Sequence, residues 1–165
     1  MGKLFYIMGK SASGKDTIYQ RLLRNPEFSL ERLVIYTTRP IRDGELDGRE
    51  YHFVTEEDFQ KLKAERKIIE DRGYETVYGL WRYFTADNMN LEEKNYLGIG
   101  TLESYEKLKA YYGEEKIRPI YIEVEDGERL KRAIAREETQ EAPKYEEMCR
   151  RFLADAQDFS EEKIR

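Results

Sequence analysis

The clearest hydrophobic pattern lies near the start of the chain, where a continuous apolar run is followed by a short polar loop and an amphipathic segment. Residues 4–8 are all aliphatic, aromatic or Met, which is typical of a buried strand. After the loop, apolar residues recur at helical spacing (Ile18, Leu22 and Leu23). The pattern therefore predicts a strand, a loop, and a helix that begins at Lys15 and ends near Asn25.

Strand-like and helix-like patterns alternate along the rest of the chain. Short β-rich runs are predicted at residues 33–36, 51–54, 68–70, 74–78, 96–100 and 119–124. Helices are predicted at residues 55–66, 102–112, 128–137 and from 145 onward, with a further helix expected around residues 88–94. This alternation predicts an α/β fold in which helices flank a parallel sheet, with residues 33–80 forming a small β-rich insertion. A length of 165 residues predicts a single domain.

Composition and charge narrow the range of partners. Charged residues make up 38% of the chain and the formal net charge is −5, so we expect no broad nucleic-acid-binding surface. Cys149 is the only cysteine, which excludes an intrachain disulfide. No apolar run approaches the ~18 residues of a membrane span. We therefore expect a reduced, cytoplasmic protein that binds a small molecule and neither nucleic acid nor membrane.

The loop after the first strand has the spacing of a phosphate-binding loop, Gly9-x-x-x-x-Gly14-Lys15. Its small residues let backbone N–H groups curl around an anion, and the helix that follows points its positive end at the same place. The residues expected to bind ATP here are Gly9, Ser11, Ala12, Ser13, Gly14, Lys15, Asp16 and Thr17. The alternative interpretation is a glycine-containing turn that caps the helix and binds no ligand.

The residue after Lys15 departs from the motif, which normally continues with a Ser or Thr whose hydroxyl faces Mg²⁺. Here Asp16 takes that position and Thr17 follows. Polyphosphate repels a neighbouring carboxylate unless a cation lies between them, so Asp16 either approaches Mg²⁺, binds it through water, or turns away. Asp16 and Thr17 are therefore the candidate magnesium ligands.

A second stretch, TTRPIRDGELDGREYHF at residues 37–53, resembles the TTRPxRxGExDGxxYHF motif of the guanylate kinases. With the phosphate-binding loop ahead of it, the resemblance covers residues 1–79 well, and it extends over residues 80–165 through helix order and arginine placement. It implies a P-loop NTPase fold in one domain, residues 1–165. Within that domain it implies a core of about 1–32 and 80–130, a nucleoside-monophosphate-binding insertion of about 33–80, and a helical lid of about 132–150.

The resemblance also implies an acceptor site for GMP. Guanidinium groups bind phosphate with paired hydrogen bonds, so Arg39 and Arg42 suit a phosphate clamp, and the Tyr51 hydroxyl can donate to the same phosphate. Guanine presents two adjacent N–H donors that one carboxylate accepts together, which makes Glu70 the candidate base reader. Tyr78 corresponds to a further phosphate-contacting tyrosine. In the alternative interpretation, the arginines pair with acidic neighbours in a solvated loop (Asp43, Glu45 or Asp47).

The C-terminal part of the chain supplies arginines that the resemblance places in the lid. Arg132 and Arg136 match the family's pair, and Arg150 or Arg151 falls where a third arginine follows. Closing such side chains over bound nucleotides expels water and offsets charge that develops on the transferred group. The expected catalytic residues are therefore Lys15, Arg39, Arg132, Arg136 and Arg150. The alternative is a solvated helix face paired with glutamates.

Several positions differ from the family pattern. A serine four residues before the first clamp arginine is Ile35 here, and a later hydroxyl position is Leu80. An Asp-x-Asp pair at a strand end is replaced by Gly98 and Gly100. One hypothesis is that Asp16 supplies part of the missing acidic charge. An Asp16→Ser variant with unchanged Mg²⁺ dependence and rate would contradict it.

The sequence favours an ATP-dependent kinase that transfers the γ-phosphoryl group to GMP with the help of Mg²⁺. One alternative is a related kinase with another acceptor, such as a ribose bisphosphate. The departures from the family pattern favour that alternative, and the retained Glu70 argues against it. A second alternative is a non-catalytic guanylate kinase-like binding module, which has little need of an intact phosphate-binding loop.

Overall fold

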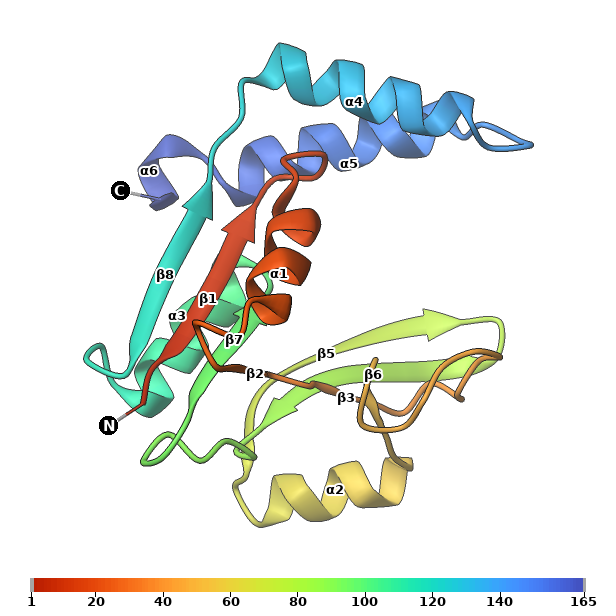
Figure 1. Cartoon of the computed structure of the whole chain (residues 1–165). Coiled ribbons are helices and arrows are strands. Elements are labelled where there is room, and N and C mark those ends of the chain that lie inside the picture. Colours follow the sequence, from red (N-terminus) through yellow and green to blue (C-terminus); the bar gives the residue numbers. More distant parts are fainter. Residues whose placement is uncertain (1, 165) are drawn as a thin grey trace.

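The structure, a computed structural model, describes residues 2–164 and contains two sheets with helices around them (Figure 1). The first is a parallel sheet of four strands in the order β2-β7-β1-β8. Its strands are β1 (Leu4–Gly9), β2 (Leu30–Arg32), β7 (Asn95–Ile99) and β8 (Ile117–Ile122). The predicted α/β fold with a parallel sheet is confirmed.

Two helices cover the opposite faces of the parallel sheet, which explains why β1 is apolar at nearly every position. One face packs against α1 (Lys15–Arg24), and the other packs against α3 (Leu102–Tyr112). Along β1 the side chains alternate, so that Ile7 faces α1 while Leu4 and Tyr6 face α3. Both helices have the predicted bounds, and the side chain of Thr101 caps α3.

The second sheet has the strand order β4-β3-β6-β5 and contains both parallel and antiparallel pairs, and we call it the mixed sheet. Its strands are β3 (Tyr36–Thr37), β4 (His52–Phe53), β5 (Ile68–Thr76) and β6 (Gly79–Ala86). Helix α2 (Glu56–Ala64) packs on one face through Phe59, which contacts Phe84 of β6. The predicted capping box of α2 is present, with Thr55 and Asp58 bonding reciprocally.

The strand predicted at residues 33–36 is wrong, because this segment passes from one sheet to the other. Residues Leu30–Arg32 pair with β7 in the parallel sheet, and Tyr36–Thr37 pair with β4 and β6 in the mixed sheet. The apolar residues between them are buried or half-buried where the sheets meet. Leu33 still donates to the Leu97 carbonyl and Ile35 still accepts from the His52 N–H, so burial at this junction, with single bonds to each sheet, accounts for their apolar character.

Two further predictions between residues 68 and 94 are also wrong. The separate strands at 68–70 and 74–78 form one strand, β5, which ends at Thr76 and turns back into β6. The helix around residues 88–94 is a single turn, in which the Lys94 N–H donates to the Asn90 carbonyl at 3.1 Å. The mixed sheet therefore continues to Ala86, past the predicted end of the insertion at residue 80.

The C-terminal part contains three helices, α4 (Asp126–Glu138), α5 (Tyr145–Asp158) and the short α6 (Glu161–Ile164). Figure 1 shows α4 and α5 side by side beyond the carboxyl end of β1, where the phosphate-binding loop lies. They occupy the region predicted as the lid. Within residues 2–164, no helix combines the length and apolar character needed to cross a bilayer.

Candidate functional site

The loop between β1 and α1, residues 9–14, has the conformation of an anion-binding loop, and we call it the phosphate loop. Gly14 adopts a left-handed conformation with φ of 85° immediately before α1. A side chain at Gly9 would lie 2.9 Å from Ser13 Oγ and 3.0 Å from the Ile122 carbonyl, so only glycine fits there. Ser13 is buried, and its hydroxyl has no hydrogen-bond partner among residues 2–164. A buried, unpaired hydroxyl in this loop fits an anionic ligand.

The residues predicted to contact the nucleotide phosphates and Mg²⁺ lie on the first turn of α1. Lys15 is half-buried, whereas Asp16 and Thr17 are exposed. The positive end of the helix and the Lys15 ammonium therefore act in the same place, and the carboxylate and hydroxyl needed for Mg²⁺ are adjacent to them. These residues fit a magnesium-bound polyphosphate.

Side chains from α4 and α5 bind the backbone of the phosphate loop. Arg132 Nη1 donates to the Ala12 carbonyl at 3.4 Å, which brings this predicted lid arginine to the loop. Arg129 Nε donates to the Ser11 carbonyl at 3.0 Å, and the Ser11 N–H donates to Asp155 Oδ2 at 2.9 Å. The sequence interpretation missed Arg129 and Asp155, because charged residues on amphipathic helices usually face solvent. Ser11 is predicted to bind nucleotide, but here both its N–H and its hydroxyl donate to Asp155 Oδ2.

Among the described residues, the other predicted lid arginines make no hydrogen bond to the loop. Arg136 and Arg151 line a cavity of about 320 Å³ between α4 and α5, together with Ser11. Arg150 and Arg151 both pair with Glu147, but of the two it is Arg151 that lines this cavity. The geometry therefore favours Arg151 over Arg150 as the third lid arginine. The catalytic roles of Arg132, Arg136 and the third arginine stay predictions.

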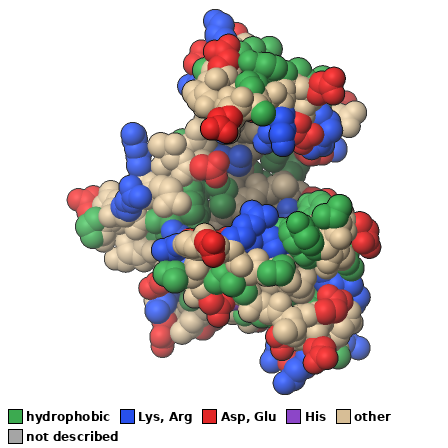
Figure 2. Space-filling view, turned by 90° about the vertical axis from the view of Figure 1, so that its right-hand side faces the viewer, with side chains coloured by type: hydrophobic (Ala, Val, Ile, Leu, Met, Phe, Trp, Pro, Cys, Tyr) green, Lys and Arg blue, Asp and Glu red, His purple; other side chains and the backbone are tan. Residues whose placement is uncertain are grey.

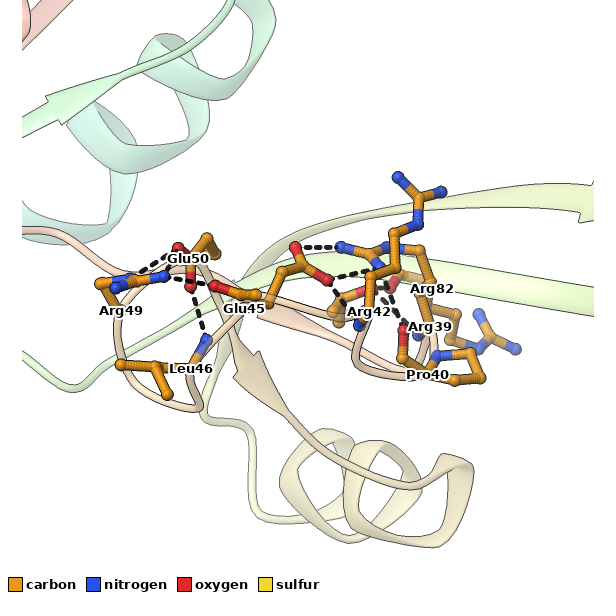
Figure 3. A network of polar contacts seen from close by, with 10 residues as sticks. Arg39, Pro40, Arg42, Glu45, Leu46, Arg49, Glu50 and Arg82 are labelled. Carbon is orange, nitrogen blue, oxygen red and sulfur yellow. Dashed lines mark hydrogen bonds and ion pairs between the residues drawn. The ribbon is translucent and has the colours of Figure 1, made fainter.

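The predicted phosphate clamp contains a buried ion pair, shown in Figure 3. Arg39 is 4% exposed and donates from both terminal nitrogens to the Glu45 carboxylate, at 2.9 and 2.8 Å. The pairing with Glu45 considered as an alternative is therefore present, with a buried Arg39 and a Glu45 side chain that is 16% exposed. Arg42 bonds Glu45 only through its backbone N–H, and its guanidinium extends away from the pair (Figure 3). The rings of Tyr51 and Phe53 pack against Arg39, with Arg39 Cζ 5.4 and 5.6 Å from their centroids.

The Arg39–Glu45 pair predicts that the stability of the protein falls in acid. Hydrogen bonds from Arg39 lower the pKa of Glu45 to about 2 and raise the pKa of Arg39. Because the folded-state pKa of Glu45 lies below its unfolded value of ~4.3, the pair stabilises the fold above that pH. This stabilisation is lost as pH falls towards 2. We expect the melting temperatures of wild type and Glu45→Gln to differ most above pH 5 and to converge by about pH 2. A constant difference across this range would contradict the prediction.

The face of the mixed sheet opposite α2 carries three cross-strand pairs of β5 and β6. Glu70 lies opposite Thr85, Arg72 opposite Tyr83, and Tyr74 opposite Trp81. Glu70 is 5% exposed and accepts a hydrogen bond from Thr85 Oγ1 at 2.9 Å. Arg72 Nε is buried without a hydrogen-bond partner among the described residues and lies 3.6 Å from Glu70 Oε2. This face therefore places a buried carboxylate and a guanidinium side by side.

Tyr78 occupies the turn between β5 and β6, is 81% exposed, and stacks on Trp81 with ring centroids 6.0 Å apart. Tyr83 lies next to Tyr51, with the ring centroids 5.7 Å apart, and its proximity contributes to the raised pKa of Arg39. The sequence interpretation missed Tyr83 because it did not identify β6. The role of Tyr78 as a phosphate contact stays a prediction, and the geometry favours Tyr83.

Tyr6 explains the two glycines at the end of β7. A Cβ atom at Gly100 would lie 2.0 Å from Tyr6 Oη, and one at Gly98 would lie 2.8 Å from Tyr6 Cδ1. The Tyr6 hydroxyl bonds Ser104 Oγ at 2.7 Å, and burial raises its pKa to about 12. The Tyr6 side chain therefore takes the space of side chains at these two positions. The remaining departures, Ile35 and Leu80, lie in the sheet crossing and beside the β5–β6 turn.

The candidate site as a whole spans the space between the two halves of the molecule. Figure 2 shows a hollow between α4 and α5 above and the mixed sheet below, with Lys and Arg side chains at its centre. The phosphate loop, with Lys15 and Arg132, comes from one side, and the mixed sheet, with Glu70 and Arg39, comes from the other. This arrangement suits a reaction between two anionic ligands.

Comparison with known proteins identifies relatives over nearly the whole chain. The guanylate kinase family model matches residues 1–162. The chain is 39% identical over 101 residues to guanylate kinase of Schizosaccharomyces pombe, covering 61% of this chain and 44% of that protein. It is 31% identical over 157 residues to guanylate kinase of Wolbachia pipientis wMel, covering 94% of this chain and 75% of that protein.

The comparison with solved structures agrees at the level of fold. The crystal structure of guanylate kinase from Anaplasma phagocytophilum matches with a TM-score of 0.59 and 23% identity, covering 99% of this chain and 73% of that one. The chain spans 44% of the Schizosaccharomyces pombe protein and 42% of the guanylate kinase of Neisseria meningitidis serogroup A, less than half the length of either. With a family match over residues 1–162, the chain belongs to the guanylate kinase family.

Proposed function

We propose that the protein catalyses Mg²⁺-assisted transfer of the γ-phosphoryl group of ATP to GMP, which yields ADP and GDP. The observation that carries the proposal is the Glu70–Arg72 pair on the mixed sheet. The edge of guanine presents an acceptor, O6, next to two N–H donors. Glu70 supplies a buried carboxylate acceptor, and Arg72, whose Nε forms an ion pair with it at 3.6 Å, places a guanidinium beside it. Adenine lacks this arrangement, so the pair favours a guanine base.

In this proposal each side of the hollow binds one substrate. The phosphate loop amides, the Ser13 hydroxyl and Lys15 bind the phosphates of ATP. Arg42, Tyr51 and Tyr83 bind the phosphate of GMP, beside an Arg39 that Glu45 holds in place. Asp16 and Thr17 would hold Mg²⁺, which when bound would supply neutralisation of the polyphosphate charge. No general base is needed, because phosphoryl transfer depends mainly on positioning and charge neutralisation.

The test is ADP release from ATP and Mg²⁺ with GMP, dGMP, AMP or ribose bisphosphate as acceptor, for wild type and Glu70→Gln. The variant replaces one acceptor oxygen with an NH₂ donor that faces the N–H donors of guanine. Loss of a charge-assisted hydrogen bond costs about 1.5–3 kcal/mol, so we expect kcat/KM for GMP to fall roughly 10-fold to 100-fold. Turnover with AMP should change little.

Glu75→Gln is the matched control, because Glu75 lies on the same strand but is exposed near the turn. It should leave GMP turnover unchanged. If no nucleoside monophosphate is phosphorylated although ATP binds, the acceptor assignment fails. A second acceptor class, a ribose bisphosphate, then gains support from Tyr6, whose ring and neutral hydroxyl fill the space where a family member carries acids.

A further inference from the structure

One residue of the phosphate loop has a backbone conformation that its side chain disfavours. Ala12 has φ of 60°, in the left-handed region where the Cβ of any L-residue crowds the backbone. Glycine adopts this conformation without that steric cost, as Gly14 does two residues later. A strained residue of this kind persists only where the surrounding contacts determine its conformation.

The peptide groups on both sides of Ala12 are bound by side chains from α4 and α5. The Ser11 N–H donates to Asp155 Oδ2 of α5 at 2.9 Å, and the Ser11 carbonyl accepts from Arg129 Nε of α4 at 3.0 Å. The Ala12 carbonyl accepts from Arg132 Nη1 at 3.4 Å. These contacts fix the orientations of the peptides before and after Ala12, and with them its φ and ψ.

Arg129 is unlike the other arginines of α4, because it is buried and fully engaged. It is 1% exposed, and its Nη1 donates to Asp126 Oδ1 at 2.7 Å while its Nη2 donates to Asp155 Oδ2 at 3.3 Å. Its guanidinium also lies 4.7 Å from the centroid of the Phe152 ring. A side chain held in this way is not free to reach a substrate. A buried ion pair by itself adds little to the stability of a fold. Stability alone therefore does not explain why Arg129 is held in this arrangement.

We infer that Arg129 and Asp155 are positioning residues, which hold the Ser11–Ala12 segment of the phosphate loop in its anion-binding conformation. They do so from α4 and α5, so binding of the donor nucleotide depends on how these helices pack together. The inference rests on the proposed function only in taking a nucleotide polyphosphate as the ligand of the loop.

The test measures ADP affinity by calorimetry for wild type, Asp155→Ala, Ala12→Gly and the double variant. Asp155→Ala releases the Ser11 N–H and frees part of Arg129, so we expect ADP to bind at least 10-fold more weakly. Ala12→Gly removes the steric cost of the left-handed conformation, so the loop needs less support. In that background Asp155→Ala should weaken ADP binding less than 3-fold. Asp158→Ala, one turn later on α5, is the matched control and should leave the affinity unchanged.

The readouts separate positioning from a purely structural role. A purely structural role predicts that Asp155→Ala lowers the melting temperature but leaves the affinity for ADP unchanged, and this result would overturn the inference. So would an affinity loss that Ala12→Gly does not rescue. If Asp155→Ala does not fold, Arg129→Lys serves instead, because one ammonium cannot serve the Ser11 carbonyl and both carboxylates in the guanidinium geometry. It should show the same loss and the same rescue.

The proposed function can fail without the inference failing. A wild-type protein that binds ADP and shows the expected loss and rescue, yet does not phosphorylate GMP, contradicts the acceptor assignment alone. With active protein, the KM for ATP should rise in Asp155→Ala while the KM for GMP stays the same. An equal rise in both would contradict a role confined to the donor side.

Discussion

For the proposed reaction, we expect a Lys15→Met variant to phosphorylate GMP roughly 100-fold to 1,000-fold more slowly than wild type, the usual effect of removing one donor that stabilises charge in a transition state. Lys15 is the first residue of α1, directly after the left-handed Gly14. Its ammonium therefore adds to the positive end of the helix, where the transferred phosphoryl group would lie. The measurement is kcat and KM for ATP at saturating GMP.

Lys10→Met is the control for this variant. Lys10 belongs to the same loop, but its ammonium lies 3.7 Å from Asp126 at the start of α4. It should therefore affect kcat by less than about 3-fold, as expected for a partly exposed ion pair. Equal losses in the two variants would show that overall positive charge matters, and not the position of Lys15.

Gly100→Ala should lower the free energy of unfolding by about 3 kcal/mol, through overpacking and loss of a buried hydrogen bond. The new Cβ would lie 2.0 Å from Tyr6 Oη and 2.8 Å from Ser104 Oγ, so the bond between these hydroxyls cannot persist. Denaturant unfolding measures the change. Gly127→Ala on α4 is the control, because its Cβ meets only Glu125 Oε1 at 3.7 Å.

A double-mutant cycle tests whether Tyr6 is the cause. Tyr6→Val has its own cost, since it removes a buried ring, but it also removes the closest atom that a side chain at Gly100 would meet and leaves only the Ser104 Oγ contact at 2.8 Å. In the Tyr6→Val background, Gly100→Ala should cost less than about 1 kcal/mol, which is a coupling of about 2 kcal/mol between the two positions. Additive effects would show that the backbone at Gly100 needs glycine for another reason.

The parts of the structure that the sequence predicted are encoded by neighbouring residues. The phosphate loop is one continuous motif, and the helices α1, α2 and α3 have their start signals within a few residues. Strand β6 was missed because its pairing with β5 determines it, and its own pattern mixes Trp81, Arg82 and Tyr83 without clear periodicity.

The candidate site could be predicted only in part, for the same reason. Arg39, Glu70 and Lys15 belong to local motifs, so a single sequence identifies them. Contacts between distant residues remain invisible, such as those of Tyr6 with Gly100 or of Arg129 with Ser11. Arg129 carries no local signal, because its burial depends on how α4 and α5 pack over the loop.

The stacked Tyr78 and Trp81 give the molecule a built-in optical probe. Trp81 is the only tryptophan of the chain, and it lies opposite Tyr74 on the β5–β6 hairpin. Indole emission, excited at the red edge of the aromatic absorption band, therefore originates from the mixed sheet alone. An occupant of the hollow beside this hairpin changes the surroundings of the indole, whereas a ligand confined to the phosphate loop does not touch it. Emission spectra thus allow the two binding events to be followed separately in one titration.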